Sequence, residues 1–367
     1  MKIGIAIPTL VDGDAVGNDV LGMTRALRRR GHDVLLFAWT GKVNEPVKTP
    51  DELPQTLTSP DDVLIYHHSI GCDWAVKAVE SLPCRRKAVK YHNVTPPEFF
   101  AATNPAVAAG CAQGIAEVGR LAKTDAAIWA DSEFNAAHVR ELCPGREVAE
   151  LPPFHQADQL FAAEPDYQAV AGLDDWNTNI LLVGRLVPNK NIPLAVRAFA
   201  DYRERFDPRA RLVVVGDRPV PEHAAEVEKL IDEHGVGGAT LVTGKVTVSQ
   251  LKALYLTADV LLVTSRHEGF CVPLVEAMGL RLPVVAVPTA AVPYTGGDAA
   301  RYAEADPAAI ADRIREVLAD PAECQGQVLR GWDRYESQFT NAAIEERFLS
   351  LFDELLANGR REPASAG

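Results

Sequence analysis

Short apolar runs alternate with segments of helical periodicity along most of this chain, and the alternation restarts once. Strands that are covered on both faces form such runs, and strands separated by helices favour a parallel, doubly wound sheet. In the first half the expected strands are 3–8, 34–38, 62–67, 87–91 and 126–130. In the second half they are 180–184, 211–215, 240–242, 259–263 and 283–286. The pattern therefore predicts an α/β fold with two doubly wound, Rossmann-like domains.

A proline-containing stretch without periodicity, residues 151–177, separates the two series and is the expected linker. We expect an N-terminal domain over residues 1–165 and a C-terminal domain over residues 166–340. The stretch from about 341 to 358 carries five apolar residues on one helical face, which predicts a final amphipathic helix. The tail at 360–367 is expected to be disordered.

Composition narrows the possible partners. The 367 residues carry a net charge of −13, which argues against nucleic acid and against electrostatic docking on an anionic membrane. The six cysteines show no CxxC spacing, so no zinc or redox motif is visible. The N-terminus lacks the features of a signal peptide, and no apolar run approaches the roughly 18 residues that span a bilayer. We expect a cytoplasmic protein without a transmembrane segment.

Two glutamates eight positions apart flank a glycine turn and a proline in the segment from Ser265 to Gly279. Pro273 suits the first turn of a helix, so Glu268 is expected in the loop after a strand and Glu276 about one turn inside the helix. Free N–H groups at the start of that helix suit an anion, and the carboxylates suit sugar hydroxyls. The pattern indicates a site for both halves of a nucleotide-sugar; the alternative is two solvated glutamates.

Two cations follow the strand expected at 180–184. Arg185 comes directly after Gly184, and Lys190 follows five residues later. This pair suits a diphosphate, because a guanidinium bridges two oxygens and an ammonium acts as a point charge. A transferase needs such groups where charge develops on its leaving group. The alternative is a pair of solvated loop cations.

Histidines close two expected strands of the first half. His92 follows the strand 87–91, at the sheet edge where ligands bind in open α/β folds. There it could hydrogen-bond a sugar hydroxyl or assist the movement of a proton. His67 and His68, after the preceding strand, are rival candidates. A single histidine at a strand end is more often structural.

The first loop, residues 12–18, contains two glycines that would let the backbone approach a ligand, and it precedes a helix expected over about 19–30. It also contains Asp12 and Asp14, and paired carboxylates bind magnesium or manganese together with phosphates. Turn chemistry already explains the small residues of this loop, so we expect no metal site there. The chain has no P-loop, no GxGxxG after its first strand and no GxSxG.

With these motifs the chain resembles the retaining glycosyltransferases of family 4, or group 1 glycosyltransferases, which have the two-domain GT-B fold with a central cleft. The resemblance covers most of the chain and is strongest over 180–312. Its most specific mark is E-x7-E, formed by Glu268 and Glu276. The further marks are Val-Gly-Arg-Leu at 183–186 with Lys190, Val-Val-Val-Gly at 213–216, Leu-Tyr at 254–255 and Arg-Gly-His-Asp-Val at 30–34.

The resemblance implies a role for each matching residue. Glu268 and His92 are the implied catalytic residues, the first on the donor sugar's hydroxyls and the second near the sugar and the transferred proton. Arg185 and Lys190 would hold the donor diphosphate, and Glu276 the ribose hydroxyls. The backbone N–H groups of Gly269, Phe270 and Cys271 would assist Glu268, while Gly244 and Val246 would lie against the base. The final helix would cross back onto the first domain.

The first loop departs from the family pattern, because a clean Gly-Gly is missing. That loop commonly meets acceptor or phosphate in the family, so Gly13, Gly17 and Asn18 are the candidates here. Cys271 stands where glycine is commoner, and Tyr294 stands roughly where many members carry a glutamate.

The implied activity is retaining transfer of a sugar from a UDP- or GDP-sugar to a sugar or small-molecule hydroxyl, in polysaccharide or secondary-metabolite glycosylation. No cofactor and no metal ion are expected. Two alternatives stay open. One is a nucleotide-sugar epimerase on the same scaffold, and the other is a non-catalytic nucleotide-sugar-binding protein.

Overall fold

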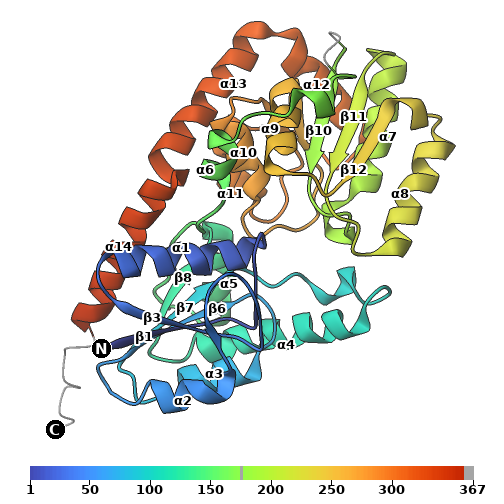
Figure 1. Ribbon diagram of the computed structural model, residues 1–367. Helices are drawn as coiled ribbons and strands as arrows, with labels where there is room; N and C mark the ends of the chain where they lie inside the picture. The colour runs from blue at the N-terminus through green and yellow to red at the C-terminus, as the bar shows by residue number, and fades with distance from the viewer. Residues whose placement is uncertain (174–176, 359–367) are drawn as a thin grey trace. The chain divides into compact units, whose positions relative to one another are not determined.

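The computed structural model describes residues 1–173 and 177–358. Its contacts divide the chain into two compact units. Residues 1–156, together with 341–358, form the first unit, and the described residues of 157–340 form the second. Both units are α/β with parallel sheets, so the predicted fold class of two Rossmann-like domains is confirmed (Figure 1). No helix in these two stretches is long and apolar enough to cross a membrane.

The expected linker, residues 151–177, contains regular structure. It includes the short helix α6 (Ala157–Ala162) and a 3-10 turn at Tyr167–Val170. Leu160 is buried in a hydrophobic core that belongs to the second unit. This burial explains why the stretch folds as part of that unit. The expected boundary between residues 165 and 166 therefore lies inside that unit. Residues 174–176 of the linker and the tail at 360–367 lie outside the described residues.

The sheet of the first unit is parallel, and its strand order reverses at β1. In spatial order its strands are β5 (Val47–Lys48), β3 (Asp33–Phe37), β1 (Lys2–Ala6), β6 (Val63–His68), β7 (Arg86–Tyr91), β8 (Ala127–Ala130) and β9 (Ala149–Glu150). A separate parallel pair consists of β2 (Thr9–Val11) and β4 (Thr40–Lys42). Because the chain fills one side of β1 before the other, the loops after β1 and β6 leave the sheet next to one another.

Helices cover both faces of this sheet. α3 (Asp73–Ser81) and α4 (Pro105–Leu121) contribute to the core on one face, and α1 (Ala15–Arg29) and α14 (Asn341–Asn358) to the core on the other. The remaining helices are α2 (Leu53–Thr56) and α5 (Glu133–Leu142). Four of the five residues of the predicted apolar face are buried, Ile344, Phe348, Phe352 and Leu355, and the fifth, Leu351, is partly buried against the same core. α14 therefore completes the core of the first unit, although it follows the second unit in the chain (Figure 1).

The first helix begins four residues earlier than predicted. The prediction placed its start near Asp19, but α1 starts at Ala15 because Asp14 caps it. The Asp14 carboxylate accepts a hydrogen bond from the Gly17 backbone N–H at 3.4 Å, and aspartate is a favoured residue at this position. Gly17 and Asn18 are therefore helical residues and do not belong to the loop.

The second unit repeats the same strand order. Spatially its strands are β12 (Thr240–Gly244), β11 (Arg211–Val215), β10 (Asn179–Val183), β13 (Val260–Val263), β14 (Val284–Ala286) and β15 (Arg301–Tyr302). Its longer helices are α7 (Ile192–Arg205), α8 (Pro221–Glu233), α9 (Val248–Thr257), α10 (Val272–Gly279), α12 (Pro307–Ala319) and α13 (Pro321–Arg334); α11 (Val292–Gly296) is short. The order reverses at β10, between β11 and β13.

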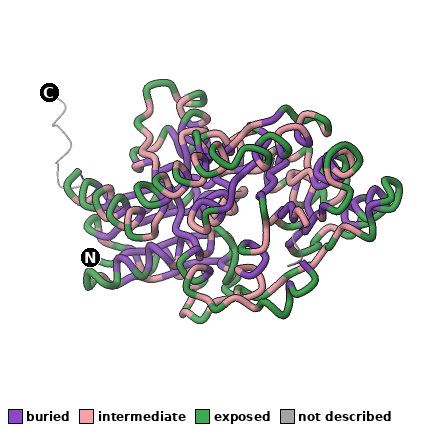
Figure 2. Tube along the Cα trace, turned by 90° about the horizontal axis from the view of Figure 1, so that it is seen from above, coloured by how far each residue is buried: buried purple, intermediate pink, exposed green. Residues whose placement is uncertain are grey.

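Alternate residues of each central strand in the second unit serve two different cores. Ile180 and Leu182 point to the core formed with α7, α8 and α12, whereas Leu181 and Val183 face the core formed with α9 and α10. This alternation is the period-two geometry of a strand with both faces covered. Figure 2 shows long buried stretches in the interior and exposed turns at the surface.

Phe348 tests whether α14 stabilises the first unit. Its side chain is completely buried among residues of α1 and β8, so Phe348→Ala should lower the free energy of unfolding by about 3–5 kcal/mol. Urea denaturation measures this difference. The matched control is Glu346→Ala, an exposed position on the same helix, which should change little. Equal stability of both variants would contradict the assignment of α14 to this core.

Candidate functional site

The second unit places two loops next to one another at the reversal of its strand order. One loop follows β10 and the other follows β13, and these two strands pair directly through Ile180 and Val260. Ligands of doubly wound sheets bind outside the carboxyl ends of the strands at this kind of switch point. Most of the residues that the sequence analysis selected in the second half lie on these two loops or on α10.

Glycines allow the loop after β10 to take its path. A Cβ atom added to Gly184 would lie 3.3 Å from both Cδ and Cε of Lys190, so glycine leaves room for the lysine stem. A Cβ atom on Gly216 would lie only 2.0 Å from the Gly184 carbonyl oxygen. The close approach of the chain after β10 to the chain after β11 therefore depends on glycine at Gly216.

An ion pair joins the two loops. The Lys190 ammonium nitrogen lies 2.6 Å from Glu268 Oε1, and the Ser265 hydroxyl donates to the same oxygen at 2.6 Å. Both Ser265 and Glu268 are buried. The other carboxylate oxygen, Glu268 Oε2, accepts no hydrogen bond from the residues described here. Lys190 and Glu268 were predicted as separate ligand contacts, and their contact with one another was not predicted.

Main-chain groups strengthen the same junction. The Arg266 N–H donates to the Asn189 carbonyl oxygen at 2.7 Å, and the Asn189 side-chain amide donates to the His267 carbonyl oxygen at 3.2 Å. The Thr264 hydroxyl lies 3.1 Å from the Lys190 carbonyl oxygen and 3.2 Å from that of Asn191. The two loops therefore form one hydrogen-bonded structure rather than two independent segments.

Charged side chains of the two loops change the pKa of Lys190. Burial alone would lower the pKa of Lys190, but the Glu268 carboxylate outweighs burial, and the pKa of the ammonium is raised. Arg185 has the opposite effect on the pKa of Lys190, which indicates that its guanidinium is close enough to act on the same site. Arg185 itself is exposed. The loop thus presents one fixed and one exposed cation.

Cys271 has an unusual backbone conformation at the start of α10. Its φ is +76° and its ψ +70°, a left-handed conformation that glycine adopts more easily than any residue with a Cβ atom. Glycine, the residue that the resemblance makes commoner at this position, adopts this conformation more easily. Burial raises the pKa of the Cys271 thiol, and Glu268 raises it further, so the thiol is neutral at pH 7. Its side chain does not cap α10, which leaves the first N–H groups of the helix available to an anion.

Glu276 lies in the middle of α10 and is held by a tyrosine. The Tyr255 hydroxyl on α9 donates to Glu276 Oε2 at 2.6 Å. Burial raises the pKa of this carboxyl group, and the hydrogen bond from Tyr255 acts against that rise. Both Glu268 and Glu276 raise the pKa of Cys271, so both carboxylates lie near this residue. The role of Tyr255 as a partner of Glu276 was missed, because nothing in the local pattern signals it.

The other residues that were predicted to bind the nucleotide-sugar lie at or near strand ends of the second unit. Gly269 and Phe270 complete the loop before α10, and the Phe270 carbonyl oxygen accepts from the Thr295 hydroxyl at 2.6 Å. Gly244 ends β12 with a φ of +71°, and its carbonyl oxygen accepts from the Gly216 N–H at 3.1 Å. Val246 follows Gly244 by two residues and packs against the core that is formed with α9 and α10.

The first unit surrounds His92 with protein partners. His92 Nδ1 lies 2.9 Å from Asp131 Oδ2, and its Nε2 lies 2.9 Å from His67 Nδ1. The His92 side chain is only 4% exposed. A substrate contact through either ring nitrogen would require one of these hydrogen bonds to break. The rival histidine His68 is also committed, to the Tyr66 hydroxyl and the Gly114 carbonyl oxygen, and burial lowers its pKa to about 4.

The first loop has structural explanations for its candidates. Gly13 has a φ of +78°. A Cβ atom on Gly17 would lie 2.3 Å from the Val11 carbonyl oxygen, and the Asn18 side chain accepts from the Gln156 amide at 2.9 Å. Asp14 is the helix cap, and no potential metal-binding group found among the described residues includes it. The turn interpretation of this loop agrees with these contacts.

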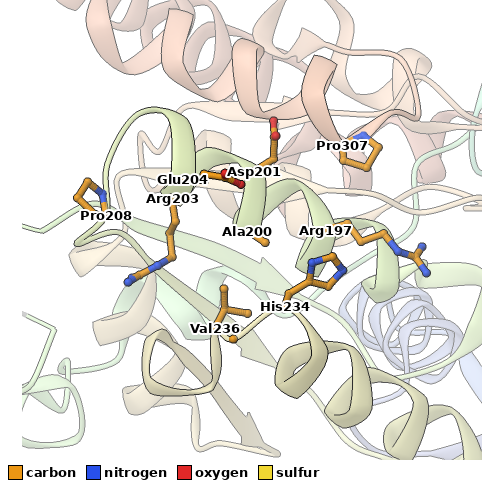
Figure 3. Close-up of a pocket in the computed structure, with 10 residues that line it drawn as sticks. Arg197, Ala200, Asp201, Arg203, Glu204, Pro208, His234, Val236 and Pro307 are labelled. Atoms are coloured by element: carbon orange, nitrogen blue, oxygen red, sulfur yellow. The ribbon is translucent and has the colours of Figure 1, made fainter.

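A surface hollow of about 560 Å³ lies elsewhere on the second unit, along α7 (Figure 3). Arg197 and Arg203, both on α7, point away from one another in this view. A ligand site needs polar groups that converge on one point, and the two arginines of this hollow do not converge. The loops at the switch point therefore remain the candidate site.

Comparisons with known proteins match most of the second unit to a family. Residues 164–330 match the family model of glycosyl transferases group 1. A GDP-mannose-dependent alpha-(1-6)-phosphatidylinositol monomannoside mannosyltransferase of Mycolicibacterium smegmatis is 28% identical over 61% of this chain and 59% of its own length. A lipopolysaccharide 1,2-N-acetylglucosaminetransferase of Salmonella typhimurium is 24% identical over 82% of this chain and 76% of its own. The chain thus spans about three-fifths of the first relative and three-quarters of the second.

Solved structures share the fold over nearly the whole chain. The Anabaena protein HepE, solved with UDP and glucose, superposes with a TM-score of 0.77 at 15% identity, covering 96% of this chain and all of its own. A sucrose-phosphate synthase from Thermosynechococcus elongatus gives a TM-score of 0.76 at 18% identity, covering 98% of this chain. These likenesses concern the fold.

The Lys190–Glu268 pair offers a direct test of how the two loops are joined. Lys190→Met leaves the Glu268 carboxylate buried without its cation, and the free energy of unfolding should fall by about 3–5 kcal/mol. The double variant Lys190→Met/Glu268→Leu buries no charge and should recover most of that loss. Urea denaturation of the two variants and the parent chain provides the comparison.

The control is Lys229→Met, which removes an exposed cation paired with Glu233 on α8 and should change stability little. A Lys190→Met variant as stable as the parent chain would show that the ion pair does not join the loops in solution.

Proposed function

We propose, on the premise that residues 164–330 belong to the group 1 glycosyl transferases, that this chain transfers a sugar from a nucleoside diphosphate to an acceptor hydroxyl with retention of configuration. The observation that carries the proposal is the paired structure of the two loops. A lysine, a glutamate and an uncapped helix start meet at the switch point of a doubly wound sheet. The diphosphate, the sugar and the ribose each find a matching group there.

The diphosphate would lie at the start of α10. The N–H groups at this end of the helix are not capped by the Cys271 side chain and suit an anion, and the helix dipole favours negative charge there. Lys190 supplies an ammonium held by Glu268, and Arg185 supplies an exposed guanidinium. Leaving-group charge would therefore be stabilised by protein groups that are already in position before the reaction.

The donor sugar would contact Glu268. Lys190 and Ser265 both hold Oε1, so the orientation of the carboxylate is fixed and Oε2 faces no protein donor among the described residues. Oε2 can accept a hydrogen bond from a sugar hydroxyl near the reacting carbon. Because the ion pair with Lys190 stabilises the negative charge of the carboxylate, Glu268 is a weak nucleophile. We therefore favour departure and attack on one face of the sugar over a covalent glycosyl-enzyme.

The ribose would contact Glu276. Tyr255 holds one carboxylate oxygen, which leaves the other to accept from ribose hydroxyls. The nucleobase would lie near Gly244 and Val246 at the end of β12. The names of similar proteins include GDP-mannose for one relative and UDP for one structure, so UDP- and GDP-sugars are the donors to test.

The first unit would bind the acceptor, a sugar or another small molecule. The proposal assigns no proton transfer to His92, since both of its ring nitrogens face protein atoms. Products formed from the donor alone distinguish the alternatives. Slow hydrolysis to sugar and nucleoside diphosphate supports a transferase, an epimerised donor supports an epimerase, and binding without turnover supports a binding protein.

Substitution of the two glutamates separates their roles. Glu268→Gln should keep nucleoside diphosphate affinity but lower turnover about a hundredfold or more, because it touches the reacting sugar. Glu276→Gln should weaken nucleoside diphosphate binding roughly ten- to a hundredfold, because a charge-assisted hydrogen bond to ribose is lost. Calorimetry and steady-state kinetics measure these effects.

The control for both variants is Glu228→Gln, an exposed glutamate on α8 that pairs with Arg218. Its affinity and turnover should match those of the parent chain. Full activity of Glu268→Gln, or undiminished binding by Glu276→Gln, would remove the corresponding residue from the site.

Turnover should need no added divalent cation, since protein cations and the start of α10 neutralise the diphosphate. With the donor identified by thermal shift, rates measured in EDTA should equal those in magnesium or manganese. If activity is lost in EDTA and returns with magnesium or manganese but not with zinc, a metal ion must take part in holding the diphosphate, and Asp12 and Asp14 become the first residues to test.

A further inference from the structure

Three buried side chains of the first unit converge on one point. Asp19 comes from α1, His67 from β6 and His92 from the residue after β7. His67 Nδ1 and His92 Nε2 lie 2.9 Å apart, and Asp19 Oδ2 lies 3.6 Å from the first and 3.5 Å from the second. Asp19 and His67 are completely buried. None of the three takes part in the proposed donor site.

Hydrogen bonds within the protein do not satisfy this group. A carboxylate oxygen accepts hydrogen bonds, so His92 Nδ1 carries a hydrogen and donates it to Asp131. The contact between His92 Nε2 and His67 Nδ1 then contains a single hydrogen. Asp19 Oδ2 then has no donor among the described residues, although Asp19 Oδ1 accepts from the Phe154 N–H at 2.8 Å. His67 Nε2 also lacks a partner in this part of the chain. An unpartnered, fully buried carboxylate oxygen is costly.

From these contacts we propose that Asp19 Oδ2, His67 Nδ1 and His92 Nε2 bind one zinc ion. Ligand atoms about 2.0–2.1 Å from a tetrahedral zinc lie about 3.3 Å from one another, and the three observed separations fall on both sides of that value. Two imidazole nitrogens with one carboxylate oxygen suit zinc and disfavour magnesium or calcium, which prefer oxygen ligands.

The surroundings resemble the outer shell of a metal site. Asp131 accepts from His92 Nδ1 and so orients the ring with Nε2 toward the ion, which is the usual carboxylate–histidine–metal arrangement. The Lys90 ammonium in turn contacts Asp131 and the Leu151 carbonyl oxygen. The Phe154 N–H holds Asp19 through its other oxygen. Asp19 and Asp131 carry two negative charges and Lys90 one positive charge, so zinc with a hydroxide as its fourth ligand would make the group neutral.

The ion would tie α1 to two central strands. The local sequence pattern gave no sign of it, because the three ligands lie far apart in the chain and share no motif. The proposal does not depend on the transferase activity, and its test has a readout other than activity.

The test is the zinc content of the tag-free, full-length protein, produced with zinc in the medium and measured by mass spectrometry after gel filtration. We expect about one zinc per chain. Asp19→Asn and His67→Gln should each lose nearly all of it, and Asp131→Asn should weaken zinc binding roughly 10- to 100-fold. The matched control is His68→Gln, whose two ring nitrogens face the Tyr66 hydroxyl and the Gly114 carbonyl oxygen, and it should keep its zinc.

The parent chain alone also decides the question if a variant fails to fold. Zinc added to the metal-free protein at a hundredfold excess over its Kd should raise Tm by roughly 5–10 °C. Cobalt in its place should give the visible ligand-field bands of a four-coordinate site. A parent chain without zinc and without a Tm response would overturn the proposal and leave a shared proton as the partner of this group. Equal zinc content in the parent chain and in both ligand variants would also overturn the proposal, because the ion would then be bound elsewhere.

Discussion

The ion pair between Lys190 and Glu268 determines how the two loops of the second unit can be arranged. Both groups leave water when the unit folds, and removing a charge from water costs several kcal/mol before any partner is counted. An apolar pair of similar volume would stabilise the fold as well or better, so stability alone does not account for these residues. Their value lies in what they present, which is a fixed carboxylate beside a fixed ammonium at the start of a helix.

The strand order explains why these residues meet. Parallel strands need crossover connections, and a sheet that grows first on one side of its first strand and then on the other leaves two loops adjacent at the reversal. In the second unit that first strand is β10, and the loops after β10 and β13 carry Lys190 and Glu268. The first unit repeats the order around β1, and there the neighbouring strand ends carry the histidines and Asp131.

Much of this fold could be predicted from the sequence because its central strands are apolar on both faces. β11 occupies the predicted residues 211–215, and β7 differs from its prediction by one residue. The edge strands β4, β5, β9 and β15 were missed, since segments such as Thr-Gly-Lys and Ala-Glu contain no apolar run. The start of α1 was misplaced because its cap, Asp14, stands among residues that suit a turn equally well.

The candidate site could be predicted only in part, for a related reason. Local spacing puts Glu268 in a loop and Glu276 inside a helix, and the structure has both there. The partners of these residues come from elsewhere in the chain, 78 residues away for Lys190 and 21 for Tyr255. His92 was predicted at a strand end, but the partners that occupy its ring nitrogens are 25 and 39 residues distant. Which side chains meet across a sheet depends on strand order, and one sequence does not specify it.

The central claim is that the two loops and the start of α10 form a nucleoside diphosphate site. A crystal structure of the chain grown with UDP or GDP, whichever raises Tm in a thermal-shift comparison, tests it most directly. We predict the diphosphate at the N–H groups near Cys271 and beside Lys190, with the ribose hydroxyls on Glu276. A nucleotide bound anywhere else, or no nucleotide at millimolar concentration, would contradict the claim.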